Sequence, residues 1–488
     1  MNRCIAFTFP KFSALIFGNM GDSLIERDKQ VIWHPYTPQK YTADPIPIVR
    51  GEGVYLVDSA GKYYIDAISS WWVNLHGHAH PYIAEKIYEQ AKQLEQVIFA
   101  GFTHRPAVEL AERLLDILPG NFSKVFYSDN GSTAVEVAIK MAIQYWWNLG
   151  SVGSRESEVA NRGPGGDRQM SDSEEVNSRR RSKILALKNS YHGDTFGAMS
   201  VSERGIFTLA FQDKLFEVVP IDSANFENEM TSLTSDSSQL TTDSSLLTTH
   251  NCPILLDEVA CFIYEPVLQG AGGMRIYDAE ALNRFLTLLK EHDIICIADE
   301  VMTGFGRTGT LFASEHIESR PDIICLSKGL TGGTMALGVT ACSKKIHDAF
   351  VSEDKLKTFF HGHSYTANPL ACTAALASLD LLLKQTCIDN IREINVAHRA
   401  FLNRLKDSGH KLRTKNHRCI GTILAFEIDA GNDEYLNDIR VAITRQSLDK
   451  GVLLRPLGNT VYVMPPYCIT AEELKKVYTV ILEILDSA

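Results

Sequence analysis

The amino-acid sequence predicts an α/β protein with two unequal parts: a large domain built on a mostly parallel central sheet, and a smaller α+β domain formed by both chain ends. Short runs rich in β-branched residues recur between helical patterns in the middle of the chain, which is typical of a parallel sheet covered on both faces. From Asn368 the pattern changes to long helices with a few strands. Near the N-terminus, an alternating segment predicts a hairpin, which we expect to pack with the C-terminal part.

Length and composition restrict the class of protein. The 488 residues suffice for two to three domains with a deep site between them. Hydrophobic residues make up 45% of the chain, and no apolar run approaches the roughly 18 residues that cross a bilayer, so no membrane-spanning segment is predicted. The net charge of -11 argues against binding to nucleic acid. The one basic cluster, Arg179–Arg181, is interpreted as part of a solvated loop.

The cysteines and the N-terminus bear on the compartment. Ten cysteines are dispersed without a CxxC pair, and several, such as Cys296 and Cys325, lie inside apolar runs where a free thiol acts as a small hydrophobe. This usage favours a reducing cytoplasm. Residues 1–22 are interpreted as an N-terminal extension, in preference to an organelle-targeting segment, because they lack an Arg-rich amphipathic pattern and a cleavage signal.

The predicted elements follow in chain order. Residues 23–74 are expected to be the N-terminal part of the small domain, with a hairpin over 54–68 that turns at Ser59–Gly61. Residues 75–367 are expected to form the large domain. Strands of its sheet are predicted at 124–127, 183–187, 261–264, 294–298, 323–326 and 339–342.

Residues 368–488 are expected to complete the small domain. Its helices and strands are predicted at 369–384, 389–407, 422–428, 460–464 and from Ala471. Two polar stretches, 150–182 and 223–250, interrupt the large domain. Neither can bury enough apolar surface to offset its ordering entropy, so we expect both to be exposed, mobile inserts.

Two predicted strands end in chemically useful residues. Asp299 closes one strand and Lys328 directly follows the next. Because ligands of open α/β sheets collect at the carboxyl ends of strands, both side chains are expected to face one pocket. Desolvation lowers the pKa of a lysine there, which suits imine formation. A surface turn is the alternative for an isolated Ser-Lys-Gly, but the neighbouring carboxylate and an upstream anion site favour the functional interpretation.

That anion site is predicted at residues 127–136, where a strand leads into a helix of apolar periodicity. Gly131 and Ser132 would present unpaired backbone N–H groups where the helix dipole favours an anion. Thr133 with Glu136 resembles a capping box. A plain helix cap is the alternative.

Other patterns have simpler interpretations. The glycines of 304–309 match a dinucleotide pattern, but no long helix follows them and the acidic residue expected about 20 positions later is absent. The three histidines of 76–80 suggest metal only superficially, because Gly77 and Pro81 break the strand that would place them on one face, and no metal site is predicted. Trp71-Trp72 could form an apolar wall. Tyr191, after a strand, could stack on a flat cofactor or belong to the core.

Together these stretches resemble the class III, fold type I pyridoxal-phosphate aminotransferases. The resemblance covers roughly Val31 to Leu485 except the two inserts. The motifs that carry it are Trp33-His-Pro-Tyr36-Thr, Ser70-Trp71-Trp72, Asp129-Asn-Gly131-Ser132, Tyr191-His-Gly-Asp-Thr, Glu265-Pro-Val-Leu-Gln-Gly-Ala-Gly-Gly-Met, Asp299-Glu-Val, Ser327-Lys328-Gly, His361-Gly362-His363-Ser364-Tyr-Thr-Ala-Asn368-Pro and Arg455-Pro-Leu-Gly.

The resemblance implies catalytic roles for three of these residues. Lys328 would join the aldehyde of pyridoxal 5'-phosphate as a Schiff base and carry a proton between substrate and cofactor. Asp299 would pair with the pyridine nitrogen and keep it protonated. Tyr191 would lie against the ring.

The resemblance also implies how the cofactor and substrate are held. Gly131 and Ser132 would bind the phosphate, helped by His363 and Ser364 of a second subunit, which implies a homodimer with shared active sites. The substrate-binding residues would be Tyr36, Trp71, Trp72, Tyr191, Lys328, Gly362 and Arg455. Of these, Arg455 would clamp a distal carboxylate, with a surface ion pair as the alternative role.

Within the family, the Trp pair, Tyr36 and the Arg455 segment favour transfer of an amino group to 8-amino-7-oxononanoate, giving 7,8-diaminononanoate in biotin biosynthesis. S-adenosyl-L-methionine is the expected amino donor. Members best matched to that donor often carry Pro-Thr where this chain has His363-Ser364, so lysine stays open as the donor. Two further functions stay open, namely an aminotransferase of ω-amino acids or polyamines and a non-catalytic, cofactor-bound scaffold.

Overall fold

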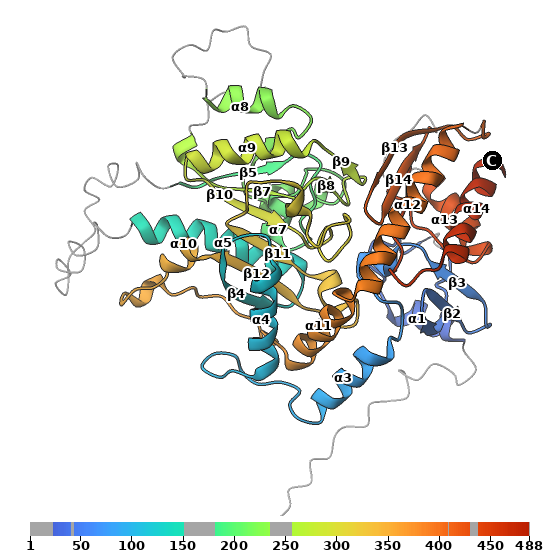
Figure 1. The fold of residues 1–488 in the computed structure, drawn as a ribbon, viewed down its shortest axis with the longest axis horizontal. Coiled ribbons are helices and arrows are strands. Elements are labelled where there is room, and N and C mark those ends of the chain that lie inside the picture. The colour runs from blue at the N-terminus through green and yellow to red at the C-terminus, as the bar shows by residue number, and fades with distance from the viewer. Residues whose placement is uncertain are drawn as a thin grey trace, which may run out of the picture.

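Two bodies of unequal size make up the fold. The computed structural model describes residues 23–40, 43–150, 181–234, 256–407, 409–429 and 438–487. Figure 1 shows a large body around a central sheet and, beside it, a smaller body that contains the C-terminus and the N-terminal strands. The predicted fold class is therefore confirmed. The N-terminal extension 1–22 and most of the two expected inserts lie outside the described residues.

The large body is organised by a seven-stranded sheet. Neighbouring strands run parallel except β12, which is antiparallel to both β11 and β4. The strand order across the sheet is β4 (Phe122–Ser128), β12 (Gly338–Ser343), β11 (Ile323–Leu326), β10 (Ile295–Asp299), β7 (Val259–Tyr264), β5 (Lys183–Leu187) and β6 (Val219–Ile221).

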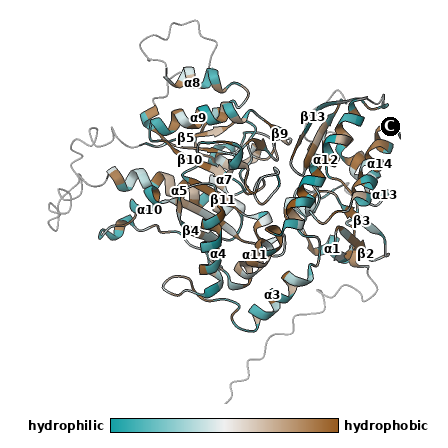
Figure 2. Ribbon diagram, viewed as in Figure 1, coloured by the Kyte–Doolittle hydropathy of each residue, from teal (hydrophilic) through white to brown (hydrophobic). Residues whose placement is uncertain are grey.

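Both faces of this sheet are buried. On one face, Ile295 and Ile297 of β10 belong to a core cluster with the apolar residues of α5 (Gly131–Gly150). On the other face, Cys296 and Ala298 belong to the core that includes α4 (Arg105–Ile117) and α9 (Ala279–Glu291). In Figure 2 the central strands are accordingly coloured mainly as hydrophobic. Two-sided burial explains why these strands are nearly continuous apolar runs in the sequence.

Further helices and short strands complete the large body. They are α3 (Pro81–Ala91), α7 (Phe196–Ser200), α8 (Phe226–Thr234), α10 (Lys344–Asp348), the two-stranded β8 (Leu268–Gln269) and β9 (Arg275–Ile276), and the 3₁₀ turns at Leu209–Lys214, Leu256–Glu258, Ala313–His316, Lys328–Thr331 and Lys355–Lys357. Helix α11 (Pro369–Leu382) was expected in the small domain, but it packs mainly on α3 and α4 of the large body.

The smaller body joins the two ends of the chain. In its first sheet, β15 (Val452–Leu453) from the C-terminal part runs parallel to β3 (Tyr63–Asp66) of the N-terminal hairpin. The remaining elements are β1 (Ile48–Glu52), β2 (Tyr55–Asp58), the second sheet of β13 (Thr414–Ile420), β14 (Ile423–Ile428) and β16 (Thr460–Val463), and the helices α1 (Leu24–Val31), α12 (Gln385–Asp407), α13 (Asp438–Asp449) and α14 (Ala471–Ser487).

The expectation that residues 223–250 form an exposed insert is wrong for residues 226–234. Residues 226–234 form α8 (Phe226–Thr234), which packs on α9, and the side chains of Phe226 and Leu233 are buried. Two apolar residues at helical spacing suffice to dock a short helix within a Ser- and Thr-rich stretch. Arg181 also departs from the expected solvated loop, because its guanidinium stacks over Trp146 and donates to the carbonyl oxygen of His292.

No single helix in the described part of the chain is long and apolar enough to cross a membrane. Only α11 and α12 taken together reach the required length and composition, and they meet at an angle of 70°. Most residues of α11 are buried in the protein.

Candidate active site

A cavity of about 710 Å³ opens at the carboxyl ends of the central strands. Asp299 ends β10, and Lys328 follows β11, which lies beside β10 in parallel register. The residues lining the cavity are Trp72, Val73, Asn130, Gly131, Ser132, Tyr191, His192, Gly193, Asp194, Thr195, Glu265, Ala271, Asp299, Val301, Met302, Ser327, Lys328, Gly333, Thr334, Met335, Ala336 and Leu337. The topology thus brings the amine of Lys328, the carboxylates of Asp299 and Glu265, and the start of α5 into one cavity.

Lys328 occupies a strained position at the end of β11. Its backbone has φ of 47°, in the left-handed region that a side chain disfavours. Burial lowers the pKa of its amine to about 8, against the opposing effect of the Asp299 and Glu265 carboxylates, while Arg307 lowers it further. No described residue accepts a hydrogen bond from Nζ, which lies 4.5 Å from the centre of the Trp72 ring. A buried amine with this pKa can be neutral and nucleophilic near neutral pH.

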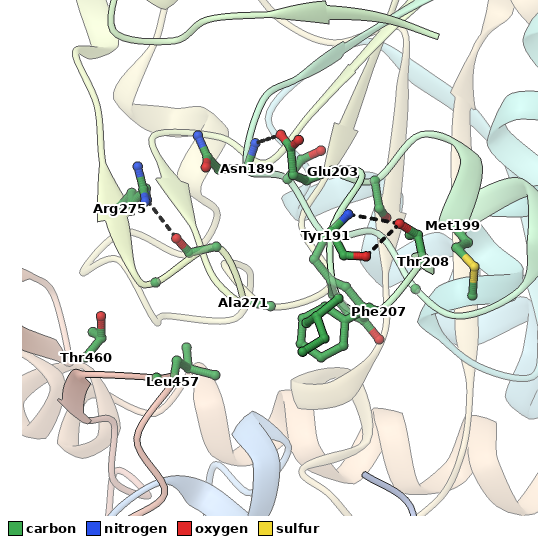
Figure 3. Close-up of a pocket in the computed structure, with 18 of the residues that line it drawn as sticks. Asn189, Tyr191, Met199, Glu203, Phe207, Thr208, Ala271, Arg275, Leu457 and Thr460 are labelled. Carbon is green, nitrogen blue, oxygen red and sulfur yellow. Dashed lines mark hydrogen bonds between the residues drawn. The ribbon is translucent and has the colours of Figure 1, made fainter. Parts of the chain in front are cut away.

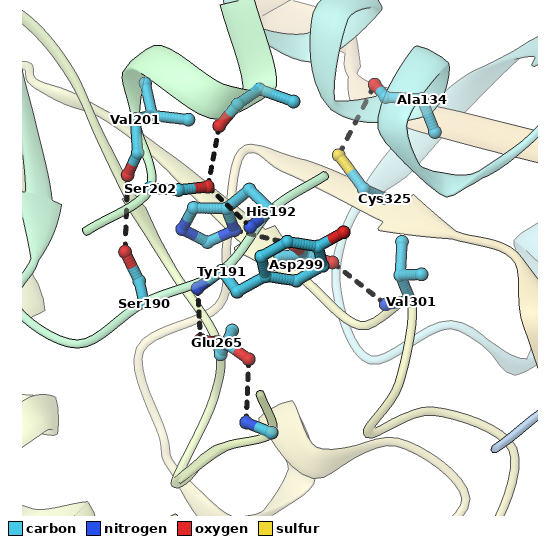
Figure 4. A network of polar contacts seen from close by, with 12 residues as sticks. Ala134, Ser190, Tyr191, His192, Val201, Ser202, Glu265, Asp299, Val301 and Cys325 are labelled. Atoms are coloured by element: carbon cyan, nitrogen blue, oxygen red, sulfur yellow. Dashed lines mark hydrogen bonds and ion pairs between the residues drawn. The ribbon is translucent and has the colours of Figure 1, made fainter. Parts of the chain in front are cut away.

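Asp299 is held by a histidine (Figure 4). His192 Nδ1–H donates to Asp299 Oδ2 at 2.6 Å, and the backbone N–H of Val301 donates to Oδ1 at 3.0 Å. The His192 side chain is fully buried, and its Nε2 has no partner among the described residues. In Figure 4 the ring of Tyr191 lies in front of Asp299. His192 had no role in the prediction from sequence, although it lies in the Tyr-His-Gly-Asp-Thr motif.

A second carboxylate, Glu265, lies in the same cavity. It accepts hydrogen bonds from the backbone N–H groups of Gly270 at 2.8 Å and Tyr191 at 3.2 Å. Burial raises the pKa of Glu265 to about 7, although His192 opposes the rise and Asp299 adds to it. The site therefore contains a carboxyl group that can be neutral at physiological pH beside one held by a histidine.

The start of α5 forms a cradle that could hold an anion. No described residue accepts a hydrogen bond from the backbone N–H of Gly131 or Ser132. The hydroxyl of Ser132 is 2.8 Å from that of Thr195 and accepts from the Thr195 N–H at 3.0 Å. A Cβ at Gly131 would lie 2.5 Å from Val301 Cγ1, so a glycine is required by close approach. Free N–H groups at a helix start fit a phosphate.

The expected capping box at this helix is wrong. Asn130 caps α5 instead, because its Oδ1 accepts from the Thr133 N–H at 3.0 Å. The carboxylate of Glu136 accepts from the backbone N–H groups of Gly197 and Ala198, at the start of α7. A short asparagine side chain reaches the first turn locally, which leaves the glutamate free to tie two helices together.

The Trp pair lies on an unusual turn. Four consecutive residues, Ser69 to Trp72, have φ between 45° and 74°. Each left-handed non-glycine residue costs about 1–2 kcal/mol, so neighbouring contacts must hold this turn. Ser69 Oγ donates to the carbonyl of Met464 at 2.8 Å, and Trp72 Nε1 donates to the hydroxyl of Tyr462 at 3.0 Å.

Arg307 lies beneath the same turn. The guanidinium is buried and donates to the backbone carbonyls of Trp72, Asn74 and Pro465. In the sequence this residue stood out only as part of a dinucleotide-like motif that lacks its context. The structure shows that the 304–309 segment fixes the loop beside the cavity.

Tyr36, Tyr191 and Asp194 form a polar cluster at the cavity mouth. The hydroxyl of Tyr36 donates to Asp194 and lies 3.2 Å from the hydroxyl of Tyr191. Burial, followed by the hydrogen bond to Tyr36, raises the pKa of Tyr191 well above its usual value. The Tyr36 ring packs edge-on against Trp71 with 5.4 Å between centres.

Beside the main cavity lies a second cavity of about 270 Å³ (Figure 3). The two share Tyr191, Gly193, Asp194 and Ala271. In Figure 3, Leu457 and Thr460 of the small body face Phe207 and Ala271 of the large one across this space. The combined site therefore spans the junction between the two bodies.

Arg455 lies near this junction without lining either cavity. Its guanidinium carbon is 4.8 Å from the centre of the Trp71 ring, and the residue is partly buried. None of the carboxylates in the described ranges forms an ion pair with it. The guanidinium is thus available to a ligand.

Residues 362–364 do not line the cavity of their own chain. His363 Nδ1 lies 3.4 Å from Asp129 Oδ2, and its Nε2 lies 3.1 Å from Nε2 of His361. The carbonyl of Ser364 accepts from Gln96, and Gly362 is exposed. A single chain therefore leaves these residues outside the site that it builds.

The histidines of 76–80 have separate surroundings. His76 Nε2 bonds Ser378, whereas His78 Nε2 donates to Asp66. Within the described ranges, no group of three or more His, Cys, Asp or Glu side chains is arranged to hold a metal ion.

Comparisons with known proteins agree with this geometry. The family model for class III aminotransferases matches residues 36–485. Adenosylmethionine-8-amino-7-oxononanoate aminotransferase of Synechococcus elongatus is 43% identical over 457 residues, which cover 93% of this chain and 98% of that protein. The protein of the same name from Helicobacter pylori is 37% identical, over 96% and 99% of the two chains. A crystal structure of that aminotransferase from Methanocaldococcus jannaschii superimposes with a TM-score of 0.81 at 34% identity, covering 95% and 99%.

Proposed function

Since the chain belongs to the class III aminotransferases, which depend on pyridoxal 5'-phosphate, we propose that it transfers an amino group to 8-amino-7-oxononanoate, with S-adenosyl-L-methionine as donor. The product is 7,8-diaminononanoate, an intermediate of biotin biosynthesis. The relatives that cover nearly the whole chain carry the name of this activity. One structural observation carries the proposal: Lys328 and Asp299 line one cavity together with the anion cradle at Gly131 and Ser132.

The residues present fit the cofactor. Free N–H groups at the start of α5 suit its phosphate, and the unpartnered amine of Lys328 suits its aldehyde. The carboxylate of Asp299, fixed by His192, suits its pyridine nitrogen. When bound, the cofactor stores the amino group between donor and acceptor and accepts the electrons released at the substrate carbon.

The chain supplies the proton transfers. A pKa of about 8 lets Nζ of Lys328 both take up and release a proton near neutral pH. Asp299 favours the protonated form of a basic nitrogen placed against it, because His192 and the Val301 N–H hold the carboxylate in a buried position. Tyr191 supplies an aromatic ring to the lining of the same cavity.

The long acceptor is bound, in this proposal, along the aromatic wall. Trp71, Trp72 and Tyr36 enclose its apolar chain, and Arg455 pairs with its distal carboxylate. The absence of a described carboxylate partner for Arg455 supports this role. Such a charged hydrogen bond contributes about 1.5–3 kcal/mol.

We also propose a homodimer with shared sites. His363 and Ser364 lie outside their own cavity, yet the family resemblance assigns them to a cofactor phosphate. On either side of them, Phe360 and Tyr365 are 74% and 63% exposed, which marks an apolar surface for a second copy. The eight cysteines that the structure describes are free, which agrees with the cytoplasmic location proposed.

Lysine is the second candidate for the donor, because the His363-Ser364 form resembles family members that draw the amino group from lysine. The decisive experiment incubates purified holoenzyme with 8-amino-7-oxononanoate and either S-adenosyl-L-methionine or lysine, and detects the diamine by mass spectrometry. Diamine formed with the first donor supports the proposal, and formation only with lysine replaces the donor. Turnover of ω-amino acids without any diamine would refute the acceptor. Lys328→Ala is the negative control.

A further inference from the structure

The left-handed turn that carries the Trp pair is tied to a buried polar network. We infer that Ser70, Asp66 and His78 are positioning residues, which act on substrate binding by fixing Trp71 and Trp72. Ser70 Oγ donates to Asp66 Oδ2 at 2.6 Å, from the middle of the turn. This inference rests on the proposed function, because it takes the Trp pair as the wall of the substrate site.

The hydrogen bonds of this network run in one direction. The N–H of Gly77 donates to Asn74 Oδ1 at 2.8 Å, so the amide nitrogen of Asn74 must face His78 and donates to its Nδ1 at 3.1 Å. His78 therefore carries its proton on Nε2 and donates to Asp66 Oδ2 at 3.0 Å. The backbone N–H of Gly77 thus sets the tautomer of His78, and the Nε2–H of His78 in turn needs an acceptor oxygen on Asp66.

Only a carboxylate satisfies the last position. Asp66 has no exposed side-chain surface and accepts on both oxygens, since the N–H of Ile68 donates to Oδ1 at 3.3 Å while Ser70 and His78 donate to Oδ2. An asparagine has one acceptor oxygen, so it must turn an N–H group toward a donor on one side. Two donors would then face each other. Either the neighbouring hydrogen bonds would have to rearrange, or Ser70 would lose its hydrogen bond to residue 66.

The turn leads directly to the reacting groups. Trp71 lies beneath the guanidinium of Arg455, and Trp72 lies beside Nζ of Lys328. A turn that relaxed from its left-handed conformation would rotate both rings out of these places. Loss of the network should therefore weaken binding of the long acceptor without removing any group that carries out the chemistry.

The test compares Ser70→Ala and Asp66→Asn with matched controls. Ser447→Ala removes a buried hydroxyl that donates to the carbonyl of Thr444 in α13, and Asp58→Asn alters a buried carboxylate in the neighbouring β2–β3 turn. Amine-loaded holoenzyme is mixed with 8-amino-7-oxononanoate in a stopped-flow absorbance experiment. We expect the half-saturating concentration to rise about tenfold for both site variants, with the limiting rate within about twofold of wild type. The controls should change neither value.

A double-mutant cycle separates positioning from general destabilisation. If Ser70 acts through the Trp pair, Ser70→Ala should add little to the weakened binding of Trp71→Ala. Additive effects, a fall of the limiting rate without a change in half-saturation, or controls that behave like the site variants would each overturn the inference. Should the wild-type enzyme use another amino acceptor, the proposed function fails, and the same comparison with that acceptor still decides the role of Ser70.

Discussion

Burial of the Lys328 amine lowers the free energy of unfolding by an amount that depends on pH. Its folded-state pKa of about 8 lies below the value of 10.5 for a free lysine. Between these values the unfolded chain binds more protons than the folded chain, so stability contributed by this group rises with pH. Below pH 8 the buried charge is destabilising, and the cost disappears above about pH 10.5.

We therefore predict that cofactor-free Lys328→Met is more stable than the cofactor-free wild type at pH 7. The advantage should shrink by about 1.4 kcal/mol per pH unit between pH 8 and 10. Urea unfolding of both proteins across this range measures it, and other titrating groups cancel in the difference. Parallel stability curves for the two proteins would contradict the pKa assigned to Lys328.

The hydrogen bond between His192 and Asp299 gives a second prediction. In His192→Leu, Asp299 would lose the donor on Oδ2 and retain only the Val301 N–H. Because a hydrogen bond to a charged group contributes about 1.5–3 kcal/mol, the Kd for pyridoxal phosphate should rise about 10- to 100-fold. Absorbance titration of cofactor-free protein measures this constant. His192→Gln, which keeps a donor, should lose less, and equal losses would assign the effect to packing.

Arg455→Ala tests the carboxylate clamp. We expect the half-saturating concentration of the oxo acid to rise by about tenfold or more. The half-reaction with an amino donor that lacks the distal carboxylate should stay near the wild-type value. Stopped-flow measurement of each half-reaction separates the two, and an equal loss in both would return Arg455 to a structural role.

What sequence reveals about single residues depends on how local their signals are. Asp299 and Lys328 stand directly after apolar strands, so their placement at one sheet edge follows from strand pattern alone. The partner of Asp299 is 107 positions away in the chain, and the motif that contains His192 pointed to the ring of Tyr191 but not to this hydrogen bond. The role of Arg307 could not be predicted either, because its contacts with the Trp72 loop arise only in the folded chain.

At the scale of elements, the start of α5 is restricted by its neighbour. In Gly131→Ala the new Cβ would approach Val301 Cγ1 to 2.5 Å, and a β-branched side chain cannot easily turn away. Such overpacking costs about 1–3 kcal/mol, and it would displace the N–H groups of the cradle.

We expect Gly131→Ala to bind pyridoxal phosphate at least about tenfold more weakly than wild type. Val301→Ala should restore part of that affinity in the double variant, because it removes both methyl groups at the clash. Equilibrium titration of the cofactor into the single and double variants measures the rescue. Without rescue, the loss would come from the helix backbone and not from this contact.

Elements were predictable where burial follows a regular period. Each of the six predicted strands of the large sheet occurs within about two residues of its expected bounds, because two-sided burial produces an apolar run. The turn at Ser69–Trp72 has no such signal, since four non-glycine residues with positive φ are held by contacts with distant segments. Helix α8 was missed because its buried residues include only two apolar ones, Phe226 and Leu233, beside the charged Glu229.

At the scale of the whole molecule, the fold was predictable because the periodic pattern of apolar residues and the sequence motifs predict the same α/β fold. Strand β15 joins the N-terminal hairpin, which agrees with the expectation that the chain ends form one smaller domain. The junction itself was not predictable. The contact of Leu457 and Thr460 with the space beside Tyr191 depends on how the two bodies pack, which no local pattern encodes.

The final prediction concerns shared sites in the proposed dimer. Each site would combine Lys328 of one subunit with His363 and Ser364 of the other. Lys328→Ala alone and the double variant His363→Ala/Ser364→Ala should both be inactive at limiting cofactor. In a heterodimer of the two, one site carries both defects and the other carries none.

Such heterodimers, co-expressed with two different affinity tags and purified through both, should therefore show about half of wild-type activity per dimer. If each chain built its site alone, every site in the heterodimer would carry one defect and no activity would return. Recovery thus depends only on whether residues 363–364 cross to the second subunit. In the proposed dimer, the exposed Phe360 and Tyr365 beside them would supply the apolar surface that such a crossing requires.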